Sequence, residues 1–191
     1  MQTDANQQIE NLRRGDPVAT RELIGMFYAR IYAFLRRLTA NDADAADLTQ
    51  RTFGRVWQAL PGFAGRSSLG SWIHSIAYHS YVDWRRTNHR TEPRSEDWWT
   101  EQVSSAPGPD ELAARHDLAN NLYASVEKLD PDLRVTIHLH YYQELTLQET
   151  ADAMSVATST VKYRLRQALT DLEKQMDAAP ARSLDARQTI Q

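Results

Sequence analysis

Apolar residues recur at helical spacing along almost all of this 191-residue chain, and one polar, proline-containing stretch from Thr87 to about Glu111 interrupts them. No run alternates apolar and polar residues over the length of a strand, and no Asn-Gly or Asp-Gly pair marks a hairpin. The pattern predicts an all-α protein with two small helical domains joined by a flexible acidic linker. We expect the first domain at residues 1–90, the linker at 91–117, the second domain at 118–176 and a polar tail at 177–191.

Start and stop signals define the expected helices. Asp16-Pro17 is a typical helix start, because Asp can cap free backbone N–H groups and Pro at the first helical position loses no hydrogen bond. The apolar series that follows predicts a helix to about Thr39. Further helices are expected from the acidic residues at 41–44 to Pro61-Gly62, from Ser68 into Arg85-Arg86, from Leu112 to Leu129, from Pro131, from Leu147, and from about Thr158 to Met176.

The charge balance at first argues against nucleic acid. The chain has 22 basic and 25 acidic residues, a net charge of -3 and a pI near 6.1. However, the acidic residues are concentrated in the segment Glu92 to Glu111, which has Arg94 as its only base. The basic residues gather elsewhere, at Arg85, Arg86 and Arg90 and again at Lys162, Arg164 and Arg166. Local clusters of this kind are what a polyanion binds.

Two expected helices near the end of the chain are joined by a three-residue turn, Ser155 to Ala157. Thr146 and Glu149 have the spacing of a capping box, which starts the first helix. This is the pattern of a helix-turn-helix, whose second helix enters the major groove of DNA. At about 100° per residue, the second helix has an apolar side and a polar side. The apolar side carries Val161, Leu165, Ala168, Leu169 and Leu172, and the polar side carries Ser159, Thr160, Lys162, Tyr163, Arg164, Arg166 and Gln167. Taken alone, this segment also fits a solvated helix of an ordinary bundle.

Several function classes are excluded or disfavoured. With no Cys, the chain has no disulfide, thiol nucleophile or Cys-based zinc site. His138 and His140 are two apart on a helix and point about 200° apart, so we expect no metal site. No phosphate-binding Gly loop or paired carboxylates appear, so we expect no cofactor and no enzyme activity. No signal peptide is visible and no apolar run approaches about 20 residues, so we expect a cytoplasmic protein without membrane insertion.

A long ordered series of motifs resembles a known family. Residues 20–90 resemble region 2 of bacterial RNA polymerase sigma factors, and residues 118–173 resemble region 4 of the same family. The region 2 motifs are Asp47-Leu48-Thr49-Gln50, Thr52-Phe53, Val56-Trp57, Phe63-Ala64-Gly65, Trp72-Ile73, Ile76-Ala77, Asp83 and Arg85-Arg86. The region 4 motifs are Leu129, Pro131, Arg134, Leu145-Thr146, Glu149-Thr150-Ala151, Thr160-Val161-Lys162, Arg164-Leu165 and Leu169. Because only these two regions fit, the chain resembles the compact extracytoplasmic-function (ECF) subfamily of the sigma-70 family.

The resemblance implies a function and partners. A sigma factor binds core RNA polymerase through the β′ coiled coil and the β flap, directs it to promoter DNA, and helps to open the duplex. An anti-sigma factor commonly holds such a protein inactive.

The resemblance also implies site residues. Those for core polymerase are Asp47, Gln50, Arg51, Phe53, Arg55 and Trp57; from the residues alone, Phe53 and Trp57 fit a core position equally well. Those for the minus-10 element are Phe63, Gly65, Arg66, Tyr78, His79, Val82, Arg85 and Arg86. Trp72 is expected in the core. Those for the minus-35 element are the polar residues of the last helix, Ser159, Thr160, Lys162, Tyr163, Arg164, Arg166 and Gln167.

Five residues depart from the family pattern. Ser155 stands where Gly commonly forms the left-handed turn, and Ala157 where Ser commonly caps the last helix, so Thr158 or Ser159 is expected to cap it instead. Arg51 replaces a common Glu, Gly54 a common Leu and His79 a common Asn.

Two rival functions stay open. A stand-alone helix-turn-helix regulator would bind duplex DNA without polymerase, but it would leave the first domain unexplained. A sigma-like decoy would keep the shape and the protein contacts without supporting transcription.

Overall fold

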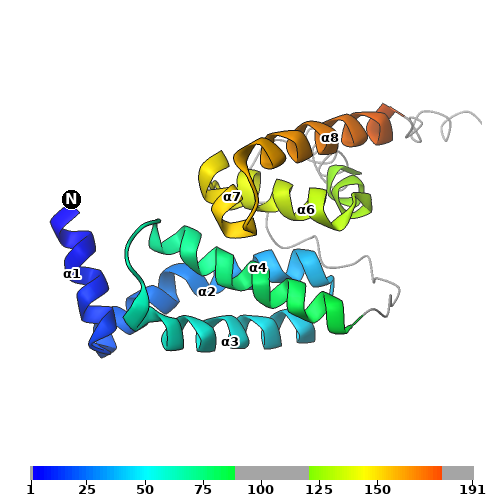
Figure 1. The fold of residues 1–191 in the computed structure, drawn as a ribbon. Helices are drawn as coiled ribbons and strands as arrows, with labels where there is room; N and C mark the ends of the chain where they lie inside the picture. The colour runs from blue at the N-terminus through cyan, green and yellow to red at the C-terminus, as the bar shows by residue number, and fades with distance from the viewer. Residues whose placement is uncertain (1, 89–120, 178–191) are drawn as a thin grey trace, which may run out of the picture. The chain divides into compact units, whose positions relative to one another are not determined.

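The computed structural model describes residues 2–88 and 121–177, and every regular element in those ranges is helical, which confirms the all-α prediction (Figure 1). The first range contains α1 (Gln2–Arg13), α2 (Pro17–Thr39), α3 (Asp42–Ala59), the short 3-10 helix η1 (Leu60–Gly62) and α4 (Leu69–Thr87). The second contains a helix over 121–128, then α6 (Pro131–Ile137), the π-helical turn η3 (His138–Tyr142), α7 (Leu147–Met154) and α8 (Thr158–Asp177). The expected linker, the residues from 178 onward and the beginning of the helix expected at Leu112 lie outside the described residues.

The helix starts follow the capping signals in the sequence. The Asp16 side chain accepts a hydrogen bond from the Val18 N–H and Pro17 is the first residue of α2. Ser68 caps α4 in the same way by accepting from the Ser71 N–H at 3.1 Å. These caps satisfy backbone donors that have no partner within the helix. The starts expected at Pro17 and Ser68 are therefore confirmed.

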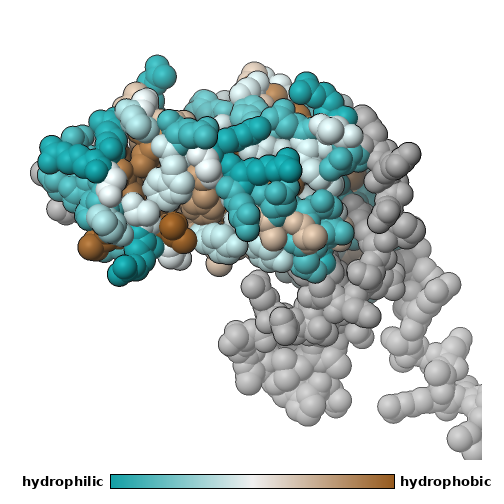
Figure 2. Space-filling view, turned by 90° about the horizontal axis from the view of Figure 1, so that it is seen from below, coloured by the Kyte–Doolittle hydropathy of each residue, from teal (hydrophilic) through white to brown (hydrophobic). Residues whose placement is uncertain are grey.

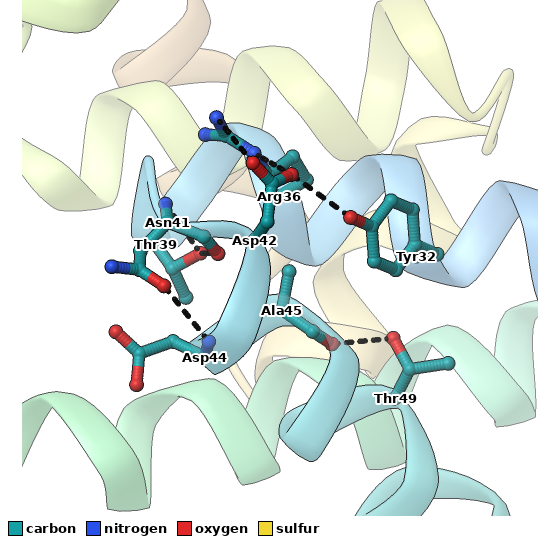
Figure 3. A network of polar contacts seen from close by, with 8 residues as sticks. All are labelled: Tyr32, Arg36, Thr39, Asn41, Asp42, Asp44, Ala45 and Thr49. Atoms are coloured by element: carbon teal, nitrogen blue, oxygen red, sulfur yellow. Dashed lines mark hydrogen bonds and ion pairs between the residues drawn. The ribbon is translucent and has the colours of Figure 1, made fainter. Parts of the chain in front are cut away.

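A polar network fixes the corner between α2 and α3 (Figure 3). Arg36 is 5% exposed, and its Nε donates to Asp42 Oδ1 at 2.6 Å. The Tyr32 hydroxyl donates to the same oxygen at 2.9 Å. These hydrogen bonds, the one from Arg36 first, hold the pKa of Asp42 below its usual value. Because Asp42 is the first residue of α3, the network sets the angle at which α3 leaves α2.

The core of the first helical bundle comes from the apolar stripes of α2, α3 and α4. Fully buried side chains include Leu23, Ile31, Phe34, Leu35, Leu48, Val56 and Ile73. Each contributes about 1.5–3 kcal/mol by leaving water. On the face seen from below in Figure 2, hydrophilic residues predominate and hydrophobic surface occurs in small patches.

Helix α1 was not expected from the sequence, because its residues are largely polar. Its anchor is Leu12, which is 2% exposed. The guanidinium of Arg13 also donates to the backbone carbonyl of Phe63. Only Ile9 and Leu12 give α1 large apolar residues at helical spacing, and one pair is too short a periodic signal to predict a helix.

The chain forms two compact units, of which the first combines residues 1–94 with 138–161 and the second combines 95–137 with 162–191. Segment 138–161, which contains η3 and α7, therefore packs with α1 to α4. The sequence predicts domains that are continuous along the chain, at residues 1–90 and 118–176. These boundaries remain a prediction of which segments fold independently.

Candidate polymerase and promoter surfaces

The residues expected to bind core polymerase lie on α3 and divide into an exposed group and a packed group. Asp47, Gln50 and Arg51 are exposed on one side of the helix, and Arg51 Nη2 lies 2.8 Å from Asp47 Oδ2. Phe53 is 7% exposed and stacks on Tyr28 of α2, with 5.9 Å between the ring centres. Trp57 is half-buried. The exposed group can contact a partner directly, whereas Phe53 packs between α3 and α2 and stabilises the position of α3.

Arg55 has a structural role that the sequence did not indicate. Its Nη1 donates to Ser80 Oγ at 3.2 Å and its Nη2 donates to Asp83 Oδ2 at 3.1 Å. Both partners lie on α4, so Arg55 ties α3 to α4. A polymerase contact by Arg55 would therefore compete with this tie.

The loop before α4 contains the first residues expected to bind the minus-10 element. Gly65 has a φ of +69°, a backbone conformation that favours glycine, and Arg66 beside it is exposed. Phe63 differs from the expectation of an available ring, because it is 5% exposed and packs 4.6 Å from the ring of Trp72. The Phe63 ring belongs to the core in this structure, and only Gly65 and Arg66 are presented to a ligand. Trp72, expected in the core, is half-buried.

The remaining minus-10 candidates share one face of α4. At about 100° per residue, five side chains fall within an arc of about 120°. They are Tyr78, His79, Val82, Arg85 and Arg86, and we call them the α4 face. The rings of Tyr78 and His79 lie 5.2 Å apart. Arg86 is exposed and its Nη2 is 3.7 Å from Asp83 Oδ1, while Arg85 lies over the Tyr81 ring.

Helix α8 has the two sides that the sequence predicts, with two differences. Val161, Leu165, Ala168 and Leu172 are all buried, but Leu169, expected with them, is 48% exposed. On the polar side, Ser159, Lys162, Tyr163, Arg166 and Gln167 are exposed and Thr160 is half-buried. We call these six residues the α8 face.

Arg164 is the second difference on α8. Its Nη2 lies 2.5 Å from Asp132 Oδ2 of α6, and its side chain is only 19% exposed. The ion pair directs Arg164 toward α6, so the structure separates it from the α8 face.

The turn between α7 and α8 confirms one expectation about the helix-turn-helix and overturns another. Ser155 has a φ of 55°, which is the left-handed conformation expected there. The capping box of Thr146 and Glu149 is also present. However, α8 begins at Thr158, which makes Ala157 the cap position. The Thr158 hydroxyl instead donates to Gln148 Oε1 at 2.9 Å, so the expected cap by Thr158 or Ser159 is wrong.

The two histidines of η3 are packed within the protein. His140 Nδ1 lies 2.7 Å from the Leu145 carbonyl, and His138 is 3% exposed. Within residues 2–88 and 121–177, no three potential ligands are grouped so that they could hold a metal ion. No helix in the same described ranges is both long and apolar enough to cross a bilayer.

Comparison with known proteins agrees with this arrangement. The family model "Sigma-70 region 2" matches residues 23–91, and the model "Sigma-70, region 4" matches residues 119–172. The chain is 33% identical over 159 residues to the ECF RNA polymerase sigma factor SigX of Bacillus subtilis (strain 168), covering 81% of this chain and 82% of SigX. It is 28% identical to RNA polymerase sigma factor YlaC of the same organism, covering 81% of this chain and 90% of YlaC.

Two solved structures have the same fold. CnrH, in complex with the cytosolic domain of CnrY, has a TM-score of 0.68 at 21% identity, covering 92% of this chain and 98% of CnrH. RpoE of Bartonella quintana, in complex with the anti-sigma factor NepR, has a TM-score of 0.68 at 18% identity, covering 84% of this chain and 98% of RpoE.

The chain therefore belongs to the sigma-70 family of RNA polymerase sigma factors. Within that family it is an ECF sigma factor, a protein that binds core RNA polymerase and directs it to promoters. Proteins of this kind are in general DNA-binding regulators rather than enzymes.

Proposed function

We propose that three surfaces of the chain divide the work of transcription initiation. The exposed group on α3 binds the β′ coiled coil, the α4 face with Gly65 and Arg66 holds the opened minus-10 element, and the α8 face reads the minus-35 element. The proposal rests mainly on one observation: the exposed polymerase candidates share one side of α3, five minus-10 candidates share one side of α4, and six minus-35 candidates share one side of α8. We further propose that the chain itself is not an enzyme and acts in the cytoplasm, where the promoter DNA lies.

The α4 face is suited to single-stranded DNA. Tyr78 and His79 offer rings for stacking, and Arg85 and Arg86 lie one to two turns further along the same face to hold phosphates. Taking one base out of the stack costs a few kcal/mol, and stacking on an aromatic ring returns about 1–3 kcal/mol. The exposed loop residues Gly65 and Arg66 add a place where the backbone of the DNA can approach closely.

The α8 face is suited to duplex DNA. Arg166 and Gln167 can each make two hydrogen bonds to a purine edge, and Lys162 with Ser159 can hold phosphates. All four side chains are exposed, so they reach a groove without rearranging the helix. Arg164 is excluded from this role by its ion pair with Asp132.

Additional partners follow from the family. We propose that region 4 also contacts the β flap of polymerase, and that an anti-sigma factor restrains the protein. The support for the second partner is that RpoE, which has the same fold, was solved in complex with the anti-sigma factor NepR.

Run-off transcription with core polymerase tests the division of work. Start-site-specific transcripts are expected only when core polymerase and this chain are both present. Asp47→Ala with Gln50→Ala should abolish co-elution with core polymerase. Arg85→Ala with Arg86→Ala should preserve co-elution and abolish permanganate reactivity of the opened DNA. Glu22→Ala, an exposed change on α2 that belongs to none of the three surfaces, is the control.

Three outcomes would overturn the proposal or redirect it. Binding of promoter DNA by the chain alone, with no effect of polymerase, would identify a stand-alone regulator. Co-elution with polymerase without any specific transcript would identify a decoy. Loss of co-elution in the α4 variant would show that the two surfaces of region 2 are not separate.

A further inference from the structure

Helix α7, the first helix of the helix-turn-helix, packs on α4 of region 2 within the same compact unit (Figure 1). Polar contacts join the beginning of α4 to α7, and join α4 to Gln143, which lies between η3 and α7; they link residues about 70 to 80 positions apart in the chain. Neither polymerase binding nor promoter binding accounts for these contacts.

Glu149 is the centre of the first group of contacts. Its Oε2 completes the capping box of α7 by accepting from the Thr146 N–H at 3.0 Å. Its Oε1 accepts from the hydroxyls of Ser68 at 2.9 Å and Ser71 at 2.6 Å, at the beginning of α4. One carboxylate therefore serves the N-terminal ends of two helices, where negative charge is favoured. The hydrogen bond from Ser71 makes the largest contribution in lowering the pKa of Glu149 to about 2.

A second group of contacts is buried around Gln143. His74 of α4 is 1% exposed, and its Nε2 lies 3.0 Å from Gln143 Oε1; Gln143 itself is 4% exposed. Arg30 Nη2 of α2 donates to the Gln143 carbonyl at 3.1 Å. Buried polar side chains need partners, and here the partners come from the two sides of the contact. The sequence thus specifies this packing with matched polar groups and not only with apolar surface.

The contact also reaches the promoter-binding surfaces. Ser155 Oγ, in the turn before α8, lies 3.4 Å from Nε2 of His79, a member of the α4 face. Elements at positions −10 and −35 are about 25 base pairs apart, which is about 85 Å along B-DNA. The beginning of α8 cannot reach the minus-35 element while the turn before it lies against the surface that binds the minus-10 element.

We propose that the α4–α7 contact is an autoinhibitory latch, closed by Glu149 and Gln143, that must open before the chain can hold both promoter elements. The proposal rests on the proposed roles of the α4 and α8 faces. Opening the latch frees His79 and the turn at Ser155 together. The 32 residues between the two described ranges could span at most about 115 Å if fully extended, which exceeds the separation that promoter binding requires.

A reversible cross-link tests whether the closed arrangement is inactive. Ser75 lies one turn from both Ser71 and His79 on α4, and these two residues contact Glu149 and Ser155. Asp152 is an exposed residue of α7 between Glu149 and Ser155 in the sequence, so a linker between positions 75 and 152 would bridge the two helices at their contact. Neither is one of the residues proposed to bind polymerase or DNA. Ser75 lies on the same side of α4 as Tyr78, so the singly labelled Ser75→Cys chain is the control for steric effects of the reagent. Because the chain has no Cys, the double variant Ser75→Cys with Asp152→Cys carries the only two thiols. A cleavable bis-maleimide of about 10 Å should join them within one molecule.

The cross-linked chain should give at least tenfold fewer specific transcripts with core polymerase, and cleaving the reagent should restore them. The single variants, treated identically, should keep their activity. The latch is refuted if the thiols do not join within the folded chain, or if the cross-linked chain transcribes as well as the cleaved one. If the untreated double variant and the unmodified chain both give no specific transcript, the proposed function fails instead, and the cross-linking yield still reports on the contact.

A second variant tests the role of Glu149 without altering α7. Ser71→Ala removes a hydroxyl donor to Glu149 and keeps the backbone cap of α4. Loss of a hydrogen bond to a charged group should shift the latch toward the open form about tenfold. Cross-linking of the thiol pair should slow accordingly, and the concentration of the chain needed for half-maximal transcription should fall. Ser75→Ala, one turn further on α4, is the matched control in the chain without thiols. Unchanged values for Ser71→Ala would overturn the assignment of Glu149.

Discussion

The α4 face and the α8 face are both proposed to bind promoter DNA, but the protein uses their side chains differently. On α4, Tyr78, Val82 and Arg85 are half-buried and His79 contacts Ser155. On α8, Lys162, Arg166 and Gln167 are exposed, and Tyr163 is 61% exposed. A surface that reads an intact duplex can be one exposed side of a helix, because the major groove accommodates the whole helix. A surface that holds separated bases needs rings supported from below, and those supports also make it part of the fold.

The loop that precedes α4 gives the largest expected effect in this comparison. Phe63→Ala should lower the free energy of unfolding by about 3–5 kcal/mol, because it removes a buried ring that packs on Trp72. Phe63→Leu keeps most of the buried volume and should lose much less. Urea unfolding followed by circular dichroism measures both. If Phe63→Leu folds normally but gives no opened DNA, the ring has a direct role with a base in addition to its role in the core.

The α8 face gives the next largest effect. Arg166→Ala should weaken promoter binding by the polymerase complex by about 1–3 kcal/mol and relax the preference at one base pair. Lys162→Ala should weaken binding to all sequences and reduce the salt dependence by about one phosphate contact. Filter binding at several salt concentrations separates the two results.

Arg164→Ala is the matched comparison, because Arg164 is paired with Asp132 within the protein. It should lower stability by about 1 kcal/mol and leave the salt dependence unchanged. A reduced salt dependence for Arg164→Ala would return Arg164 to the DNA-binding surface.

The sequence predicts a feature of these surfaces well when the residues that determine the feature are close together in the chain. The capping box at Thr146 and the start of α2 at Pro17 rest on residues within four positions of each other, and both are confirmed. The apolar stripe of α8 was also visible, although Leu169 lies at its edge and is exposed. Periodicity places a side chain on an arc, but it does not say how wide the buried strip is.

The sequence could not predict contacts between distant residues. The local pattern indicates Glu149 as a cap, but its other oxygen accepts hydrogen bonds from Ser68 and Ser71, about 80 residues away. The family resemblance assigns Arg55 to polymerase, whereas its partners in the structure are Ser80 and Asp83 of α4. Helix α1 depends on Leu12 and on one hydrogen bond to Phe63. In each case the partner is set by the packing of helices, which no local pattern reports.

The titration of Glu149 gives a smaller effect. Its pKa falls from 4.5 to about 2 in the folded chain, so its stabilising contribution is present above about pH 4.5 and is lost as the pH falls toward 2. Because the carboxylate is partly exposed, screening by solvent reduces the contribution to about 1 kcal/mol. Glu149→Gln keeps the form of the capping box without a titrating group. The stability difference between the two chains should shrink between pH 4.5 and pH 2, and a constant difference would contradict the assignment.

Two glycines give the smallest effects, and they have opposite signs. Gly54 lies on the exposed side of α3 beside Arg51 and Gly65 lies in the loop before α4; a Cβ added to either meets no atom within 4 Å. Gly54→Ala should raise stability by about 0.5–1 kcal/mol, because Ala is the better helix former. Gly65→Ala should lower it by about 1 kcal/mol, because a φ of +69° strains any residue with a Cβ. Thermal unfolding of both variants measures the pair. Co-elution with core polymerase then separates fold from function at Gly54: weaker binding by the more stable variant would show that the partner approaches α3 closely at this point, and unchanged binding would place the contact nearer Asp47 and Gln50.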